Sequence, residues 1–339
     1  SGLYEVTDFA PFTETLLTAL SADDTMSFED VNGSIYFSNG TDSGRLLLGE
    51  EYPEPWSLAV PAAPMVSLTT GNLNPGSYLL SITFATAGGE EGGASPVQAV
   101  SLSAAGGISV TIPSAAPGAA FVNLYLSATD GEALTWNATV AAGSGTTVLD
   151  EPSTGHTLSQ QHLAPQPAGQ LVASHYARLL VATGALLTYS QPRTPGKYLP
   201  SKGFIQFPAR ITNIVPCAGG VYVTTTDRTY WLAGPGIAAA GMRVLLPYGA
   251  AEGSRFRSTS DATVGWYGDA GVVIADEAGS AKAIQEDRMA TATADYAAVL
   301  PRDVAGVAGL VVALRGNVAA SDLAQPDIAE EAAERLHGL

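Results

Sequence analysis

Basic residues are scarce in the first half of the sequence, and this scarcity limits what that half can bind. Residues 1–170 contain 17 acidic side chains and one basic one, Arg45, whereas residues 171–339 contain 15 acidic and 14 basic side chains. The formal net charge of −17 therefore comes almost entirely from the first half. This balance argues against non-specific nucleic-acid binding through a basic face. It fits an ordinary solubilising surface, and it also fits a surface that must not hold polyanions.

Cysteine and long apolar runs are also scarce. The one cysteine, Cys217, cannot form an internal disulfide, so the fold does not depend on oxidation. Its apolar neighbours predict a small buried thiol in a strand rather than a nucleophile. No apolar run reaches the roughly 18 residues that a membrane helix needs. Residues 1–9 have neither a basic nor an apolar leader segment, so we expect no signal peptide.

Sequence motifs of catalysis are missing as well, since there is no G-x-S-x-G, P-loop or H-E-x-x-H pattern. His156 and His162 lie six residues apart in a Ser/Gln/Pro-rich stretch, which is not the spacing of metal ligands on a strand or helix. Asp227, Asp261 and Asp269 could pair as the acid and base of a glycosidase, but turn capping explains each of them better. We therefore predict no catalytic residue, no metal and no cofactor, and we expect that the chain is not an enzyme.

The sequence is rich in glycine (37), proline (21) and short alternating apolar segments, which are typical of strands and tight turns. It therefore predicts an all-β fold. Residues 64–165 contain seven short apolar segments with turn signals between them, the pattern of a β-sandwich with Tyr125 and Trp136 in its core. The runs GSYLLSITFATAGGEEGGAS and NLYLSATDGEALTW resemble a fibronectin type III-like domain. Glu90 and Glu91 are then expected to be solvent-facing acids at a hairpin tip.

Residues 1–63 and 166–318 share a different pattern, strand–turn–strand units joined by Gly or Asp turns. Asn32-Gly33, flanked by FEDV and SIYF, is the strongest hairpin signal in the chain. The later units repeat at about 40 residues, which favours an irregular β-propeller. We predict that the sandwich is inserted between the early and the late strands of this propeller-like domain.

The C-terminal segment, residues 319–339, is the one stretch that predicts a helix. Pro326 suits a helix start, and Ile328, Ala332 and Leu336 fall near helical spacing. A helix this short is marginal alone, so we expect its apolar side to dock on a partner.

The order of the strand motifs resembles that of virion structural proteins of tailed bacteriophages, of the short-tail hub or nozzle type. In that family a strand pair ending in Y-S-x-P precedes Phe-Pro, an I-x-x-I run, a V-x-T-x-x-x-x-Y-x-L-x-G strand and a G-x-x-x-x-S…W…G run. The matching residues are Tyr189, Ser190, Pro192, Phe207, Pro208, Ile211, Ile214, residues 223–234, Gly253, Ser258, Trp266 and Gly271. The resemblance covers residues 25–315.

The resemblance implies a non-catalytic structural protein that forms a closed ring, usually a hexamer, around the channel through which the genome leaves. Its implied partners are copies of itself, other tail or portal and adaptor proteins, and DNA that passes without tight binding. The implied location is the tail of a virion assembled in the cytoplasm of the bacterial host. The candidate residues for an acidic lumen or interface are Asp23, Asp24, Glu29, Asp30, Glu50, Glu51 and Glu54.

Two other hypotheses stay open. One is a glycan-binding or glycoside-hydrolysing propeller with an accessory sandwich, which needs acids and aromatics gathered at one propeller mouth. The other is a component of a long tail or an adhesin, because the motifs describe a fold and not a tail length. The mass in solution separates a ring from a monomer.

Overall fold

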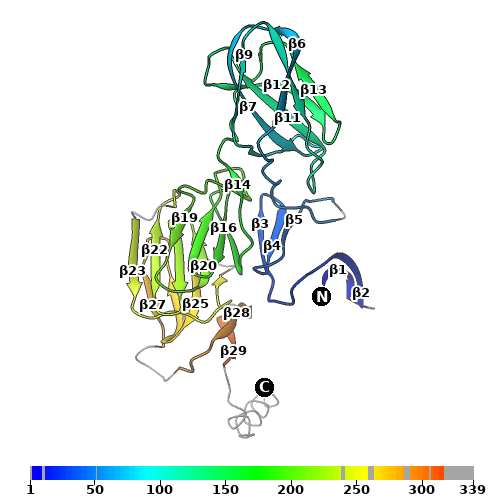
Figure 1. Ribbon diagram of the computed structural model, residues 1–339. Helices are drawn as coiled ribbons and strands as arrows, with labels where there is room; N and C mark the ends of the chain where they lie inside the picture. Colours follow the sequence, from blue (N-terminus) through cyan, green and yellow to red (C-terminus); the bar gives the residue numbers. More distant parts are fainter. Residues whose placement is uncertain are drawn as a thin grey trace. The chain divides into compact units, whose positions relative to one another are not determined.

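The computed structural model describes residues 2–9, 12–50, 52–237, 241–258, 263–285, 291–304 and 307–316 (Figure 1). Strands make up 55% of the described residues and no α-helix occurs among them, which confirms the predicted all-β class. The contacts divide the chain into two compact units, residues 1–206 and residues 207–339. None of the described residues belong to a helix long and apolar enough to cross a membrane.

The first unit begins with two small antiparallel sheets. Strands β1 (Gly2–Phe9) and β2 (Phe12–Ala19) pair with each other as a two-stranded hairpin. Strands β3 (Ser27–Val31), β4 (Ser34–Ser38) and β5 (Ser43–Leu46) form a three-stranded sheet. Asn32 and Gly33 join β3 to β4 with positive φ angles of 57° and 81°. A two-residue type I′ turn requires positive φ angles at both of its central residues, so the predicted hairpin is confirmed.

Residues 65–149 form two antiparallel sheets around one core, here called the two-sheet module. One sheet holds β6 (Met65–Leu73), β10 (Gly106–Thr111) and β13 (Thr146–Leu149); the other holds β7 (Gly76–Ala85), β8 (Glu91–Ala94), β9 (Gln98–Leu102), β11 (Phe121–Ser127) and β12 (Leu134–Ala141). Leu80 and Leu124 of the larger sheet share the buried core with Ile108 of the smaller sheet. Alternating apolar residues on the two inner faces supply this core.

The chain leaves the two-sheet module alongside its last long strand. The backbone N–H of Trp136 on β12 donates to the carbonyl of His156 at 2.8 Å, and the N–H of Leu158 donates to the carbonyl of Leu134 at 2.8 Å. Residues 156–158 therefore continue the larger sheet beyond β12, so this connection is held by backbone hydrogen bonds.

The strands that follow pack against the early ones. Strands β15 (Leu171–His175), β16 (Arg178–Thr183), β17 (Leu186–Tyr189) and β19 (Phe204–Gln206) form a four-stranded sheet, and β14 (Ala164–Pro165) pairs with β18 (Lys197–Tyr198). The N–H of Val172 donates to Ser27 Oγ at 3.0 Å. A shared core of Val31, Tyr36, Trp56, Val172, Leu179 and Val181 joins the two parts. Segments on either side of the two-sheet module thus form one packed body.

The second unit holds two further four-stranded antiparallel sheets and a hairpin. The first sheet is β20 (Ile211–Cys217), β21 (Gly220–Thr225), β22 (Thr229–Ala233) and β23 (Met242–Leu246); the second is β24 (Phe256–Arg257), β25 (Val264–Gly268), β26 (Gly271–Ala275) and β27 (Ala281–Ala283). Strands β28 (Tyr296–Val304) and β29 (Val307–Arg315) form the hairpin. Tyr222, Trp231 and Trp266 pack in the core between the sheets. Cys217 is buried at the end of β20, as predicted.

Several sequence-based predictions concern residues beyond those described. The C-terminal helix with Ile328, Ala332 and Leu336 is one of them, and the candidate residues Glu51 and Asp261 are two more.

Candidate functional site

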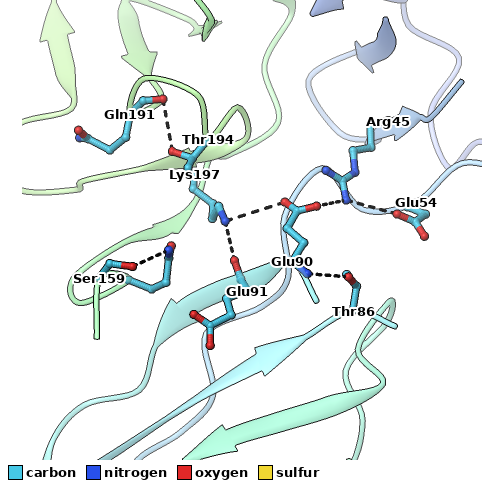
Figure 2. Close-up of polar contacts among 10 residues, drawn as sticks. Arg45, Glu54, Thr86, Glu90, Glu91, Ser159, Gln191, Thr194 and Lys197 are labelled. Atoms are coloured by element: carbon cyan, nitrogen blue, oxygen red, sulfur yellow. Dashed lines mark hydrogen bonds and ion pairs between the residues drawn. The ribbon is translucent and has the colours of Figure 1, made fainter. Parts of the chain in front are cut away.

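The first unit contains four charged side chains in contact, here called the charge cluster: Arg45, Glu54, Glu90 and Lys197 (Figure 2). Arg45 Nη2 lies 2.5 Å from Glu90 Oε2 and 3.3 Å from Glu54 Oε2. Lys197 Nζ lies 3.9 Å from Glu90 Oε1 and donates a hydrogen bond to the carbonyl of Glu91 at 2.5 Å. Glu90 is therefore shared between two cations, as Figure 2 shows.

Local backbone structure aims each carboxylate at Arg45. The backbone groups of Arg45 and Glu54 exchange two N–H···O bonds of 2.8 Å, which sets their side chains directly opposite each other. Glu90 closes the turn between β7 and β8, where its N–H donates to Thr86 Oγ1 at 3.1 Å and its carbonyl accepts from the Thr86 N–H at 2.9 Å. The turn thus fixes the one acid that reaches both Arg45 and Lys197.

Burial of the two cations is nearly complete. The exposed fraction of the side chain is 8% for Arg45 and 4% for Lys197, against 39% for Glu90. Burial alone lowers the pKa of Arg45, but the hydrogen bond and the charge of Glu90 outweigh it and raise the pKa on balance. Burial lowers the pKa of Lys197, and the charge of Glu90 opposes that change only in part. Glu90 is thus the counter-ion that makes both buried cations tolerable.

Glu91 anchors a second polar group on the larger sheet of the two-sheet module. Its Oε1 accepts hydrogen bonds from Tyr125 Oη at 2.6 Å, from Thr83 Oγ1 at 3.0 Å and from Asn123 Nδ2. Burial raises the pKa of Tyr125, and the neighbouring Glu91 adds to the rise. His156 Nε2 lies 3.2 Å from Tyr125 Oη. With so many internal donors, the Glu91 carboxylate is part of the fold and not a free acid.

These contacts correct the sequence-based interpretation of the β7–β8 loop. Glu90 and Glu91 were expected to be solvent-facing acids at a hairpin tip, and both instead bind side chains from distant parts of the chain. The expected core anchors also differ from each other: Tyr125 is fully buried, whereas Trp136 is only partly buried and stacks on His156. The partners Arg45 and Lys197 were missed because nothing in the local sequence links them to residue 90.

The predicted lumen acids that the structure describes differ in their surroundings. Glu54 belongs to the charge cluster, and Glu29 accepts hydrogen bonds from Ser174 N–H at 3.0 Å and Ser174 Oγ at 2.7 Å. Asp30 accepts the N–H of Gly33 at 2.9 Å inside the β3–β4 turn. The other acids of the set that lie among the described residues are exposed, namely Asp23, Asp24 and Glu50.

The solvent-facing charge of the first 170 residues is consequently negative throughout the described part of that segment. Arg45 is its sole lysine or arginine, and its side chain is buried against two glutamates. The exposed acids of the segment are Glu5, Glu14, Asp23, Asp24, Asp30, Glu50, Asp130, Glu132 and Glu151. The fold therefore removes the one local cation from the surface and leaves the anions there.

The remaining candidates for catalysis or metal binding lie in turns and loops. Asp227 accepts a hydrogen bond from Thr225 Oγ1 at 2.8 Å within a turn, and Asp269 lies in the β25–β26 turn. His162 is exposed, with a φ angle of 64°. The part of the chain that the structure describes has no group of three or more His, Cys, Asp or Glu side chains placed to hold a metal ion.

No protein-family model matches the chain, and no curated protein matches it at a significant level. Inferences about function therefore depend on the charge, burial and contacts of its own residues. The clearest of these features is the buried, neutralised Arg45 beneath an acidic surface.

Proposed function

We propose that the chain is a non-catalytic structural subunit of a bacteriophage tail, a hub or nozzle ring whose channel lets DNA pass. The observation that carries the proposal is the burial of Arg45, the one basic side chain among 17 acidic ones in residues 1–170. Exposed cations hold DNA because they release the counter-ions of its phosphates. A conduit that must let DNA slide has reason to lack them.

The architecture proposed for this subunit is an irregular β-propeller with an inserted sandwich. The small antiparallel sheets would be its blades, and the two-sheet module would be a fibronectin type III-like insert. The charge cluster supports the insertion, because Arg45 precedes the module in sequence, Glu90 lies within it and Lys197 follows it. Ion pairs of this kind anchor the module to the segments on either side of it.

The proposed assembly is a homo-oligomeric ring of six copies in the virion, built in the cytoplasm of the bacterial host. Its neighbours would be portal, adaptor or other tail proteins, and DNA would pass through it without tight binding. A ring requires a heterologous contact, in which two different patches of the subunit meet, since only that contact repeats around an axis of order greater than two.

Light scattering on the purified chain, followed by electron microscopy of the particles for symmetry, tests this function. A closed ring with residues 20–54 on its inner wall is the expected result. Monomers at every concentration, with acids and aromatics gathered around one pocket, would overturn it in favour of the glycan-binding alternative. Polyglutamate, measured by light scattering at the same ionic strength, is the control: it shows how much a purely anionic chain associates through its charge alone.

A further inference from the structure

The hairpin of β1 and β2 has an apolar face without a covering layer in the described part of the chain. Tyr4 pairs with Leu16 and Val6 pairs with Glu14, so these four side chains share one face. Tyr4 is 47% exposed, Leu16 48% and Val6 38%. A two-stranded hairpin alone is at best marginally stable in water. This arm therefore gains stability from any surface that covers its apolar face.

The hairpin of β28 and β29 offers a second face of the same kind. Its inner side, with Val299 and Val312, packs on the core of Phe256, Tyr267, Val272 and Ala297. On the outer side Leu300 and Val311 are directly opposed and are 63% and 51% exposed. The β28–β29 hairpin is thus covered on its inner side only, and the aliphatic pair Leu300 and Val311 lies at the middle of its outer face.

The charges of the two hairpins are complementary. The first carries the acids Glu5, Asp8 and Glu14 and no basic residue. The second carries the basic residues Arg302 and Arg315, both exposed, and one acid, Asp303. Arg302 and Arg315 lie on the outer face with Leu300 and Val311, because alternate residues of a strand share a face. The apolar face of the first hairpin therefore includes the acid Glu14, and the outer face of the second hairpin includes two arginines.

We propose that the β1–β2 hairpin of one copy of this chain docks onto the outer face of the β28–β29 hairpin of the next copy. Tyr4 and Leu16 cover Leu300 and Val311, and Glu14 lies near Arg302. The choice of a second copy as the occupant rests on the ring proposed above. Because the two surfaces differ, the contact is head-to-tail, which is the kind of contact that the proposed ring requires.

Disulfide trapping between differently labelled chains tests the contact. In a Cys217→Ala background, one full-length chain carries Leu16→Cys and another carries Leu300→Cys, and the two are co-expressed and oxidised. Each chain then has one thiol, so any 16–300 disulfide must join two copies. The matched control replaces Leu16→Cys with Leu48→Cys, since Leu48 is 90% exposed and lies outside both hairpins.

The expected result is a 16–300 dimer that forms several-fold faster than the 48–300 dimer. Glu14→Lys in the chain with Cys at position 16 should slow formation of the 16–300 dimer. Adding Arg302→Glu in the other chain should restore the rate. Rings that form while 16–300 and 48–300 dimers appear at equal rates would overturn the hairpin contact and leave the proposed function standing. Monomers without any dimer would overturn both. A chain carrying both cysteines that closes its disulfide internally would also overturn the contact between copies.

Discussion

Arg45 Nη2 lies 2.5 Å from Glu90 Oε2, although 45 residues separate the two side chains in the sequence. The arginine lies on β5 and the glutamate closes the turn into β8, so one ion pair joins the early sheet to the two-sheet module. The same pair hides the one cation of the acidic half of the chain. A contact that stabilises the fold thereby also sets the sign of the exposed charge.

Replacing the cation of this pair tests its contribution to the fold. Arg45→Met keeps most of the volume but leaves Glu54 and Glu90 without their main partner. We expect a loss of about 2 kcal/mol in the free energy of unfolding. This is less than the cost of breaking a fully buried ion pair, because the two carboxylates are about 40% exposed to solvent. Urea denaturation measures the loss.

Lys202→Met is the matched control, because Lys202 is an exposed cation in the same unit. We expect its substitution to change the free energy of unfolding by less than about 0.5 kcal/mol. Equal effects of the two substitutions would show that the buried ion pair contributes nothing beyond an ordinary surface charge.

Close backbone packing beside the charge cluster gives a second prediction. A Cβ atom added to Gly93 would lie 2.0 Å from the carbonyl oxygen of Leu163, whereas one added to Gly88 would meet nothing nearer than Thr86 Oγ1 at 3.7 Å. We expect Gly93→Ala to destabilise the chain by about 1–3 kcal/mol and Gly88→Ala to have little effect. Thermal unfolding of the two variants distinguishes them, and similar melting temperatures would contradict the packing.

Sequence was sufficient where the decisive interaction is local. Asn32-Gly33 specifies its hairpin because the two residues themselves supply the positive φ angles that the turn requires. The alternation of Leu80, Ile82 and Phe84 likewise predicts a strand with an apolar face in a core, and all three are buried, although Ser81 and Thr83 on the other face are buried too. Burial of Cys217 followed from its apolar neighbours.

Sequence was insufficient where partners come together through the fold. The turn around Glu90 reads as an exposed hairpin tip, since its composition is that of any glycine-rich loop. Its partners Arg45 and Lys197 approach it only after the flanking segments pack together. The isolation of Arg45 among 17 acids was the one available signal, because a lone cation in such a segment needs a structural reason. The same limit applies to Glu29 and Glu54, whose partners Ser174 and Arg45 come from other parts of the chain.

Asp42 gives a prediction for acid stability. Its carboxylate accepts hydrogen bonds from Ser21 Oγ at 2.5 Å and from the N–H groups of Ser21 and Ala22 at 3.0 Å. The hydroxyl of Ser21, followed by the Ala22 N–H, lowers the pKa of Asp42 to about 2. A lowered folded-state pKa contributes stability above the unfolded value of 3.8, and this stability is lost as the pH falls from about 4 toward 2.

We therefore expect the contact between residues 21–22 and Asp42 to open between pH 4 and pH 2, and amide hydrogen exchange of Ser21 and Ala22 measures the opening. Asp42→Asn should speed that exchange at neutral pH and remove its dependence on pH in this window. Asp24→Asn is the control, since Asp24 is exposed. Exchange of Ser21 in the wild-type chain that stays constant from pH 6 to pH 2, after correction for the intrinsic rate, would contradict the assignment.

Placing cations on the acidic surface tests the conduit directly. The triple variant Asp23→Lys, Asp24→Lys and Glu50→Lys puts three lysines at exposed positions of a segment that otherwise exposes none in its described part. We expect the wild-type chain to pass unretained over immobilised double-stranded DNA and the variant to bind it. Since each phosphate contact contributes about −0.9 to the slope of log K against log salt, that slope should approach about −3.

The neutral variant Asp23→Asn, Asp24→Asn and Glu50→Gln separates the effect of added cations from that of lost anions. Wild-type retention equal to that of the lysine variant would mean that the acidic surface does not exclude DNA, and the conduit would lose its physical basis.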